Sequence, residues 1–248
     1  MNKLIVSHIW KRFSIGTVEK QSFIRKKIYQ FSGTEPKKNF WALKDISFDA
    51  EGGDIIGIIG KNGSGKSTLL RTISGIYQKD RGRVKTIGGK IIAPANLNEG
   101  LKLRLTMKDN IFQCSSLLGL TKKEIKNKFW NIVKFAELED YINTKLYQFS
   151  NGMIARLASA IVFYSFTERG DILLIDDETD IFDEQFKEKC ELKLKEMTKK
   201  GAIILWATHD LKNVEKSCNK IMWIDSGKII QFGGKEVIKE YSKGVAIN

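Results

Sequence analysis

Residues 60 to 67 read Gly60-Lys61-Asn62-Gly63-Ser64-Gly65-Lys66-Ser67, which fits the pattern G-x-x-x-x-G-K-[ST]. The apolar run Ile55 to Ile59 precedes this stretch without a gap, and a short β-branched run is typical of a buried parallel strand. The residues that follow, from Ser67 to Arg71, begin a helical pattern. Strand, glycine loop and helix in this order predict a phosphate-binding loop, and a chance glycine turn beside a lysine rarely has this context.

The loop residues suit the binding of a nucleoside triphosphate. Amide N–H groups of the loop and the N-terminus of the helix would face the phosphates. Gly60, Gly63 and Gly65 allow backbone geometry that a side chain would block. We expect Lys66 to reach the β- and γ-phosphates and the Ser67 hydroxyl to help hold Mg²⁺. The rest of the expected nucleotide-binding segment consists of Lys61, Asn62, Ser64 and Thr68.

The composition narrows the class of protein without naming a partner. The 248 residues can bury one sizeable core, and the net charge is +13, from 42 Lys+Arg against 29 Asp+Glu. This excess raises affinity for polyanions, but much of it is spread along helices as Lys-rich solvated faces. No basic motif interleaved with aromatic residues is evident, so no specific nucleic-acid partner is expected.

Cysteine, histidine and hydropathy patterns exclude several other classes. Cys114, Cys190 and Cys218 are odd in number and form no C-x-x-C motif, which is typical of reduced cytosolic cysteines. His8 and His209 are the only histidines, so a histidine-rich metal centre is excluded. No apolar run approaches the ~20 residues that span a bilayer, and the first residues become polar too soon for a signal peptide.

The order of the patterns predicts one domain over 1–248. The nucleotide-binding α/β core takes 1–93 and 166–248, and a mostly helical subdomain takes 94–165. An N-terminal antiparallel sheet is predicted from a strand at about Leu4 to Ile9 and an alternating strand at 46–50. The irregular, basic segment 14–39 is an insertion in this sheet, and two readings stay open for it. It is a mobile surface loop, or it contacts membrane headgroups or a partner subunit.

Three further signals stand at the ends of predicted strands and helices. Asp176 follows four apolar residues, where a carboxylate can hold Mg²⁺ through water opposite Ser67, and Asp177 is placed for a general base on the attacking water. Ser150 is a natural N-cap for a helix from about Asn151 to Phe166, and Gly152 lets an anion approach that helix. His209 follows a predicted strand at 202–207, where it could sense the γ-phosphate.

Together and in this order, these features resemble the nucleotide-binding subunit of an ABC transporter, over nearly the whole chain. The resemblance implies a P-loop NTPase core of the α/β class, with an N-terminal antiparallel β-subdomain and an inserted helical subdomain. Segment 150–153 is similar to the family signature, and segment 176–183 to the Walker B and D-loop pattern. Asp183 then matches the D-loop aspartate and His209 the switch histidine. Phe13 matches the aromatic that stacks on adenine, with Trp41 as a second candidate.

The resemblance extends to the exporters of capsular polysaccharide, O-antigen or teichoic acid. The signature running into Arg-Leu-Ala, the segment Phe40 to Asp45 and the segment 186–190 are similar to that subfamily. The resemblance implies a motor subunit that hydrolyses ATP with Mg²⁺ and drives a polytopic membrane permease. It also implies that two copies of the chain bind two ATP molecules between them. Such a subunit sits at the cytoplasmic face of the inner membrane. Asn96 lies at about the position of the loop that couples to the permease.

Two departures from the family pattern leave other functions open. Asp177 stands where the family has a catalytic glutamate one methylene longer, and Asn151 and Met153 stand where the general signature has glycine and glutamine. The first predicts slow hydrolysis with intact ATP binding. One alternative is an ABC-type ATPase of nucleic-acid repair or translation, which the net charge allows. Another is a regulatory module that binds ATP with little turnover.

Overall fold

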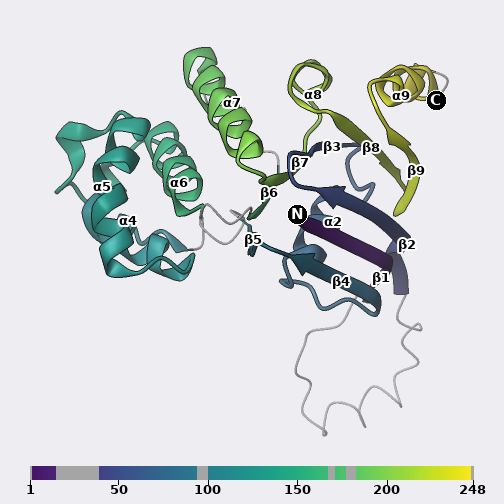
Figure 1. Ribbon diagram of the computed structural model, residues 1–248, viewed down its shortest axis with the longest axis horizontal. Coiled ribbons are helices and arrows are strands. Elements are labelled where there is room, and N and C mark those ends of the chain that lie inside the picture. Colours follow the sequence, from purple (N-terminus) through teal and green to yellow (C-terminus); the bar gives the residue numbers. More distant parts are fainter. Residues whose placement is uncertain (1, 15–38, 94–99, 167–170, 177–182, 247–248) are drawn as a thin grey trace, which may run out of the picture.

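The computed structural model describes residues 2–14, 39–93, 100–166, 171–176 and 183–246 (Figure 1). Its strands are β1 (Lys3–Ser14), β2 (Asn39–Glu51), β3 (Ile55–Ile59), β4 (Arg81–Ile87), β5 (Ile91–Ile92), β6 (Ile172–Asp176), β7 (Ile203–Ala207), β8 (Lys220–Asp225) and β9 (Lys228–Gly233). Its α-helices are α2 (Lys66–Ile73), α4 (Met107–Leu117), α5 (Lys122–Ala136), α6 (Asn151–Ser165), α7 (Glu184–Lys199), α8 (Leu211–Ser217) and α9 (Glu236–Ala246). Short 3₁₀ turns lie at Glu139–Tyr141 and Leu146–Gln148.

A six-stranded mixed sheet forms the centre, in the order β5-β6-β7-β3-β8-β9. The strands from β5 to β8 are parallel, and β9 returns antiparallel to β8. Every residue of β3 and β7 is buried, which explains their continuous apolar sequences. Because the strands are parallel, the carboxyl ends of β3, β6 and β7 lie at one edge of the sheet, and the predicted site residues stand at or after these ends.

A second, antiparallel sheet of three strands has the order β2-β1-β4. Its inner face, with Leu4, Val6 and Ile9 on β1, packs with α2 against one face of the central sheet. The pairing register shifts near His8 of β1, where His8 adopts φ 51°, Asp45 of β2 adopts φ 60°, and Gly82 of β4 adopts φ 91°. The expected antiparallel subdomain is therefore present. Of the predicted insertion at 14–39, residues 15–38 lie outside the described residues, while Ser14 and Asn39 pair as the ends of β1 and β2.

The other face of the central sheet packs against α7, α8 and α9, and its core continues into the helical group α4, α5 and α6. Figure 1 shows this group at the far side of the molecule from the antiparallel sheet. Helix α5 begins with a capping box, in which Thr121 accepts from the Glu124 amide and Glu124 accepts from the Thr121 amide. In the described part of the chain, no helix is both long enough and apolar enough to cross a membrane.

Candidate nucleotide-binding site

The phosphate loop joins the end of β3 to the start of α2, as the sequence predicts. Gly65 forms the N-cap of α2 with φ 114°, and a Cβ atom there would lie 2.9 Å from the Ala42 carbonyl oxygen. Gly63 has φ 78° and nothing within 4 Å of the place where its Cβ atom would be, so this side of the loop is open. Lys61 and Asn62 are exposed, whereas Ser64 is buried. The loop thus presents backbone to the solvent, as an anion cradle requires.

The ammonium group of Lys66 lies over the loop. Its Nζ donates to the carbonyl oxygen of Gly60 at 2.7 Å and to that of Lys61 at 3.2 Å. These carbonyls hold the charge close to the open side of the loop. Phosphate oxygens can replace them as partners of the ammonium group when a nucleotide enters.

Ser67 and Asp176 come together from α2 and β6. The Ser67 hydroxyl donates to Asp176 Oδ1 at 2.8 Å, although the two residues are 109 positions apart. A hydroxyl beside a carboxylate is an oxygen ligand set that suits Mg²⁺, which typically keeps several waters and takes one or two protein ligands. No group of three or more His, Cys, Asp or Glu side chains gathers elsewhere in the described residues. The pair therefore fits the metal role that the sequence assigns to it.

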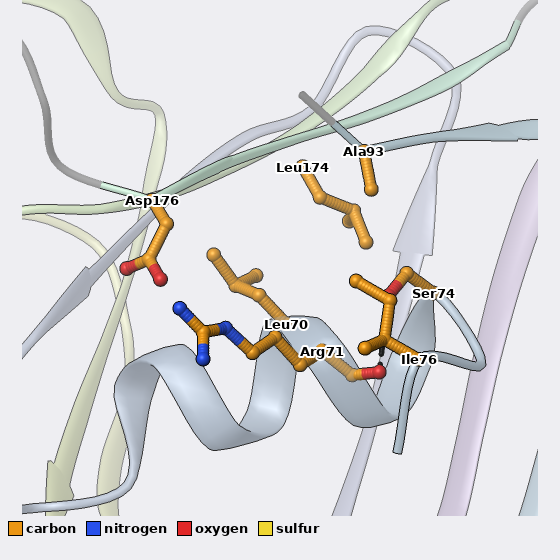
Figure 2. A pocket seen from close by; sticks show the side chains of 7 residues that line it. All are labelled: Leu70, Arg71, Ser74, Ile76, Ala93, Leu174 and Asp176. Carbon is orange, nitrogen blue, oxygen red and sulfur yellow. Dashed lines mark hydrogen bonds between the residues drawn. The ribbon is translucent and has the colours of Figure 1, made fainter. Parts of the chain in front are cut away.

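A small hollow lies behind this pair, between α2 and β6. Figure 2 shows the Asp176 carboxylate at one end of the hollow and the guanidinium group of Arg71 pointing toward it. The hollow is lined by Leu70, Arg71, Ser74, Ile76, Ala93, Leu174 and Asp176. Four of the seven lining residues are apolar, and Asp176 belongs both to the hollow and to the pair with Ser67.

Of the other residues predicted for catalysis, the structure describes His209 but not Asp177. Asp176 pairs with Ala207 in neighbouring parallel strands, so the segment after β7 begins beside Asp176. His209 is exposed two residues beyond β7, and the buried Thr208 before it accepts a hydrogen bond from the Asp210 amide at 3.0 Å. Asp177 and Asn96 lie outside the described residues. The position expected for His209 at the sheet edge is thus present, while its role stays a prediction.

The signature segment starts α6 and lies in the helical group. Ser150 is the N-cap, and its hydroxyl accepts from the Met153 amide at 3.2 Å. Asn151 is exposed and Gly152 half-buried, so this helix N-terminus is open to solvent. Figure 1 shows α6 beside α4 and α5, with α7 between it and α8. Within one chain, the structure does not bring this segment onto the phosphate loop.

Two aromatic clusters surround the candidates for the adenine contact. Phe13 meets Tyr77 edge-on at 5.2 Å, and the Tyr77 hydroxyl accepts from Arg71 on α2 at 3.1 Å. Trp41 instead meets Trp10 edge-on at 5.2 Å, with Arg12 over its ring at 5.4 Å. Phe13 is therefore linked to the helix that begins at the phosphate loop. Trp41 is held in a separate cluster of tryptophan and arginine side chains.

Asp183 has two structural roles that the sequence only partly indicates. It is the N-cap of α7, and its carboxylate accepts from the Phe186 amide at 2.9 Å. It also forms an ion pair with Arg156 of α6. The backbone hydrogen bond from Phe186, followed by the bond from Arg156, lowers the pKa of Asp183 below its usual value. The carboxylate is thereby held in its charged form between the signature helix and α7.

Sequence reasoning missed the partners that join these two helices. Arg156 also binds Glu137, with Nη1 to Oε2 at 2.7 Å, and Lys189 of α7 binds the other oxygen of Glu137 at 2.9 Å. Arg156 further lies over the Phe186 ring at 5.0 Å. Glu137 follows α5 as its C-cap with φ 60°. The sequence contains the Arg-Leu-Ala continuation of the signature, but no local pattern in it indicates these distant partners.

Comparison with known proteins agrees with this geometry. A family model described as ABC transporter matches residues 43–180. The teichoic acids export ATP-binding protein TagH of Lactococcus lactis is 34% identical over 98% of this chain, but the chain spans only 51% of that relative. The TagH protein of Staphylococcus saprophyticus is 36% identical, over 96% of this chain and 87% of the relative. The O-antigen export system ATP-binding protein RfbB of Klebsiella pneumoniae is 33% identical, over 84% of each chain.

Solved structures share the fold at lower sequence identity. An ATP-binding subunit of an ABC transporter superposes with a TM-score of 0.74 at 21% identity, covering 97% of this chain and 93% of that one. A dimeric ATP-binding cassette bound to ADP and Pi, in a post-hydrolysis state, gives 0.71 at 21% identity, covering 94% and 98%. The phosphate loop, the Ser67–Asp176 pair and the capped signature helix thus stand on the fold of an ATP-binding cassette, and the chain belongs to the ABC transporter family.

Proposed function

We propose that the chain is the ATP-hydrolysing motor subunit of an exporter that moves a lipid-linked polysaccharide across the bacterial inner membrane. Relatives over 30% identical, with most of this chain covered, are export ATP-binding proteins for teichoic acids and O-antigen. The observation that carries the proposal is the Ser67–Asp176 hydrogen bond of 2.8 Å directly behind the phosphate loop. It provides a metal-binding pair where hydrolysis needs one.

The chemistry follows from the positions of these side chains. Loop amides and Lys66 bind the phosphates of ATP. Ser67 and Asp176 would hold Mg²⁺, which would supply positive charge to the phosphates. Asp177 is the proposed base for the attacking water, and His209 the contact to the γ-phosphate at the same sheet edge. All of these groups belong to one chain. What this chain does not supply is a set of hydrogen-bond donors on the opposite side of the nucleotide.

A second copy of the chain supplies those donors in this proposal. The N-terminus of α6, with Ser150 and Gly152, is open to solvent and does not meet the phosphate loop of its own chain. A two-fold arrangement lets each copy offer this helix N-terminus to the nucleotide of the other. ATP then favours the closed pair, and hydrolysis releases it.

The membrane subunit is proposed to contact the helical group near Leu103 and Leu105. These leucines are 52% and 37% exposed, and Tyr147, 60% exposed, lies beside them because its amide donates to the Leu103 carbonyl at 2.9 Å. They form an exposed apolar patch, and Leu103 follows segment 94–99, which includes Asn96, by a few residues in the sequence. Such a patch is typical of a protein–protein contact. Docking there holds the chain at the cytoplasmic face of the inner membrane.

Co-expression with a polytopic membrane protein encoded beside the gene tests this proposal. The two should co-purify, and Leu103→Asp with Leu105→Asp should abolish the complex while leaving the ATPase activity of the isolated chain intact. Leu192→Asp is the matched control, since Leu192 is 62% exposed on α7. Loss of the complex in both variants, or turnover stimulated by nucleic acid at physiological salt, would contradict the proposal, because basic charge alone gives only salt-sensitive binding.

A further inference from the structure

The turn between β8 and β9 lies against the back of the phosphate loop. Its two central residues, Ser226 and Gly227, have φ 48° and φ 79°, as the tight turns of β-hairpins require. The Gly227 amide donates to the Ser64 carbonyl at 2.9 Å, and the Gly227 carbonyl accepts from the Lys44 amide of β2 at 2.8 Å. Three segments far apart in the sequence are thus joined by backbone hydrogen bonds.

The backbones of these three segments approach one another closely. A Cβ atom on Gly227 would lie 2.5 Å from the Ala42 carbonyl oxygen, and one on Gly60 would lie 2.2 Å from the Ile224 carbonyl oxygen. A Cβ atom on Gly65 would lie 2.9 Å from the Ala42 carbonyl oxygen. Because these distances involve backbone atoms, no rotamer change can relieve the overlap, and only glycine fits.

We propose that Gly227 is a positioning residue for the phosphate loop, and that the β8–β9 turn sets the shape of the loop before ATP binds. The proposal rests on the proposed binding of ATP at this loop. An anion cradle needs its amides outward and its carbonyls turned away, and the Gly227 N–H holds the Ser64 carbonyl on the far side. Because the loop already has this shape, little of the free energy of ATP binding is lost in ordering the loop.

The same turn fixes the phosphate loop to β2. Its carbonyl accepts from Lys44, and the Ala42 carbonyl lies against both Gly65 and Gly227. The strand that carries Phe40 and Trp41 therefore cannot shift along the loop without breaking these contacts. The turn consequently positions the aromatic end of β2 and the phosphate loop as one unit.

Gly227→Ala tests the proposal, with Gly82→Ala as the matched control. Gly82 also has a left-handed φ, of 91°, and its Cβ atom would lie 2.3 Å from the His8 carbonyl oxygen, but it belongs to β4 and does not touch the loop. Both variants should lower Tm. Only Gly227→Ala should weaken ATP binding in calorimetry, by about tenfold or more, since a displacement of ~1 Å is enough for such losses. Its KM for ATP should rise by a larger factor than its kcat falls.

Equal losses of Tm with unchanged ATP affinity in both variants would overturn the proposal. Amide hydrogen exchange of the unaltered, nucleotide-free protein provides a second measurement that needs no variant to fold. The Gly227 amide should exchange as slowly as its neighbours in β8, because it donates to Ser64 in the absence of ATP. Fast exchange at Gly227 would overturn the proposal as well. Slow exchange in a protein that fails to bind ATP would contradict the proposed function while leaving the support of the loop intact.

Discussion

Ser67→Ala tests whether the bond between Ser67 and Asp176 marks the Mg²⁺ site. Without nucleotide, the serine hydroxyl donates to the Asp176 carboxylate at 2.8 Å. With ATP bound, the same oxygen is expected to coordinate the ion, which prefers oxygen ligands in octahedral geometry. Alanine removes this ligand and leaves Lys66 and the loop amides in place. The loss of ATP affinity should therefore appear only when Mg²⁺ is present.

The expected loss is about tenfold in the Mg²⁺-dependent part of the affinity. An interaction with a charged group contributes ~1.5–3 kcal/mol, or roughly 10- to 150-fold in a binding constant. Ser67 is exposed and Asp176 is half-buried, so water can take the vacated position on the ion and the lower end of this range applies. The free energy of unfolding should fall by only ~1 kcal/mol, because one hydrogen bond is lost at a site that water reaches.

Isothermal titration calorimetry with ATP, in Mg²⁺ or in EDTA, measures the ratio of the two affinities directly. Ser74→Ala is the control, since the Ser74 hydroxyl donates to the Arg71 carbonyl at 3.0 Å at the other end of the same helix. The control should keep the full effect of Mg²⁺. A Ser67→Ala protein with the same Mg²⁺ effect as the unaltered protein would refute the assignment of the metal site.

Three further predictions follow from the other site residues. Lys66→Ala should lose ATP binding and turnover with little change in Tm, whereas Lys79→Ala, at an exposed lysine after α2, should keep both. Equal ATP affinity in the two variants would contradict the role of the ammonium group. In an Asp177→Asn background, Ser150→Phe should prevent an ATP-dependent dimer in light scattering, while Thr106→Val, which removes the N-cap of α4, should not. Asp177→Asn should hydrolyse ATP more slowly than the unaltered protein, since a general base contributes about 10²- to 10⁴-fold to the rate. Asp177→Glu should match or exceed the rate of the unaltered protein. An Asp177→Asn protein as active as the unaltered one would remove Asp177 from the mechanism.

Features encoded locally were predicted from the sequence. The phosphate loop between a buried strand and a helix and the N-cap at Ser150 are both confirmed, because each signal lies within a few consecutive residues. The predicted first strand ended at Ile9, whereas β1 continues to Ser14. The bulge at His8 shifts the alternation, so inward residues fall at Val6 and then Ile9, and the period-2 pattern is lost.

Features that depend on distant pairs could not be predicted. The β8–β9 turn meets Ser64 across more than half of the chain, and the sequence gives only a Ser-Gly turn signal there. Helix α9 was not predicted, although Val237, Ile238 and Tyr241 follow helical spacing and pack on the core, and Tyr241 meets Trp223 edge-on at 5.5 Å. Tertiary packing, which no local pattern records, decided the position of the turn. The roles of Asn96 and Asp177 remain predictions, since both lie outside the described residues.

The backbone conformation of Glu137 matters for attempts to stabilise this protein by mutation. Its φ of 60° is one that glycine adopts freely, so a rule for improving helix ends would replace it, for a gain of ~1 kcal/mol. Yet its two carboxylate oxygens separately hold Arg156 of α6 and Lys189 of α7. Glu137→Gly would relax the helix end and release the clamp between the signature helix and the helix that Asp183 caps. The same substitution should thus stabilise the end of α5 and weaken the contact between α6 and α7, so a gain in thermal stability would come with a loss of ATPase function.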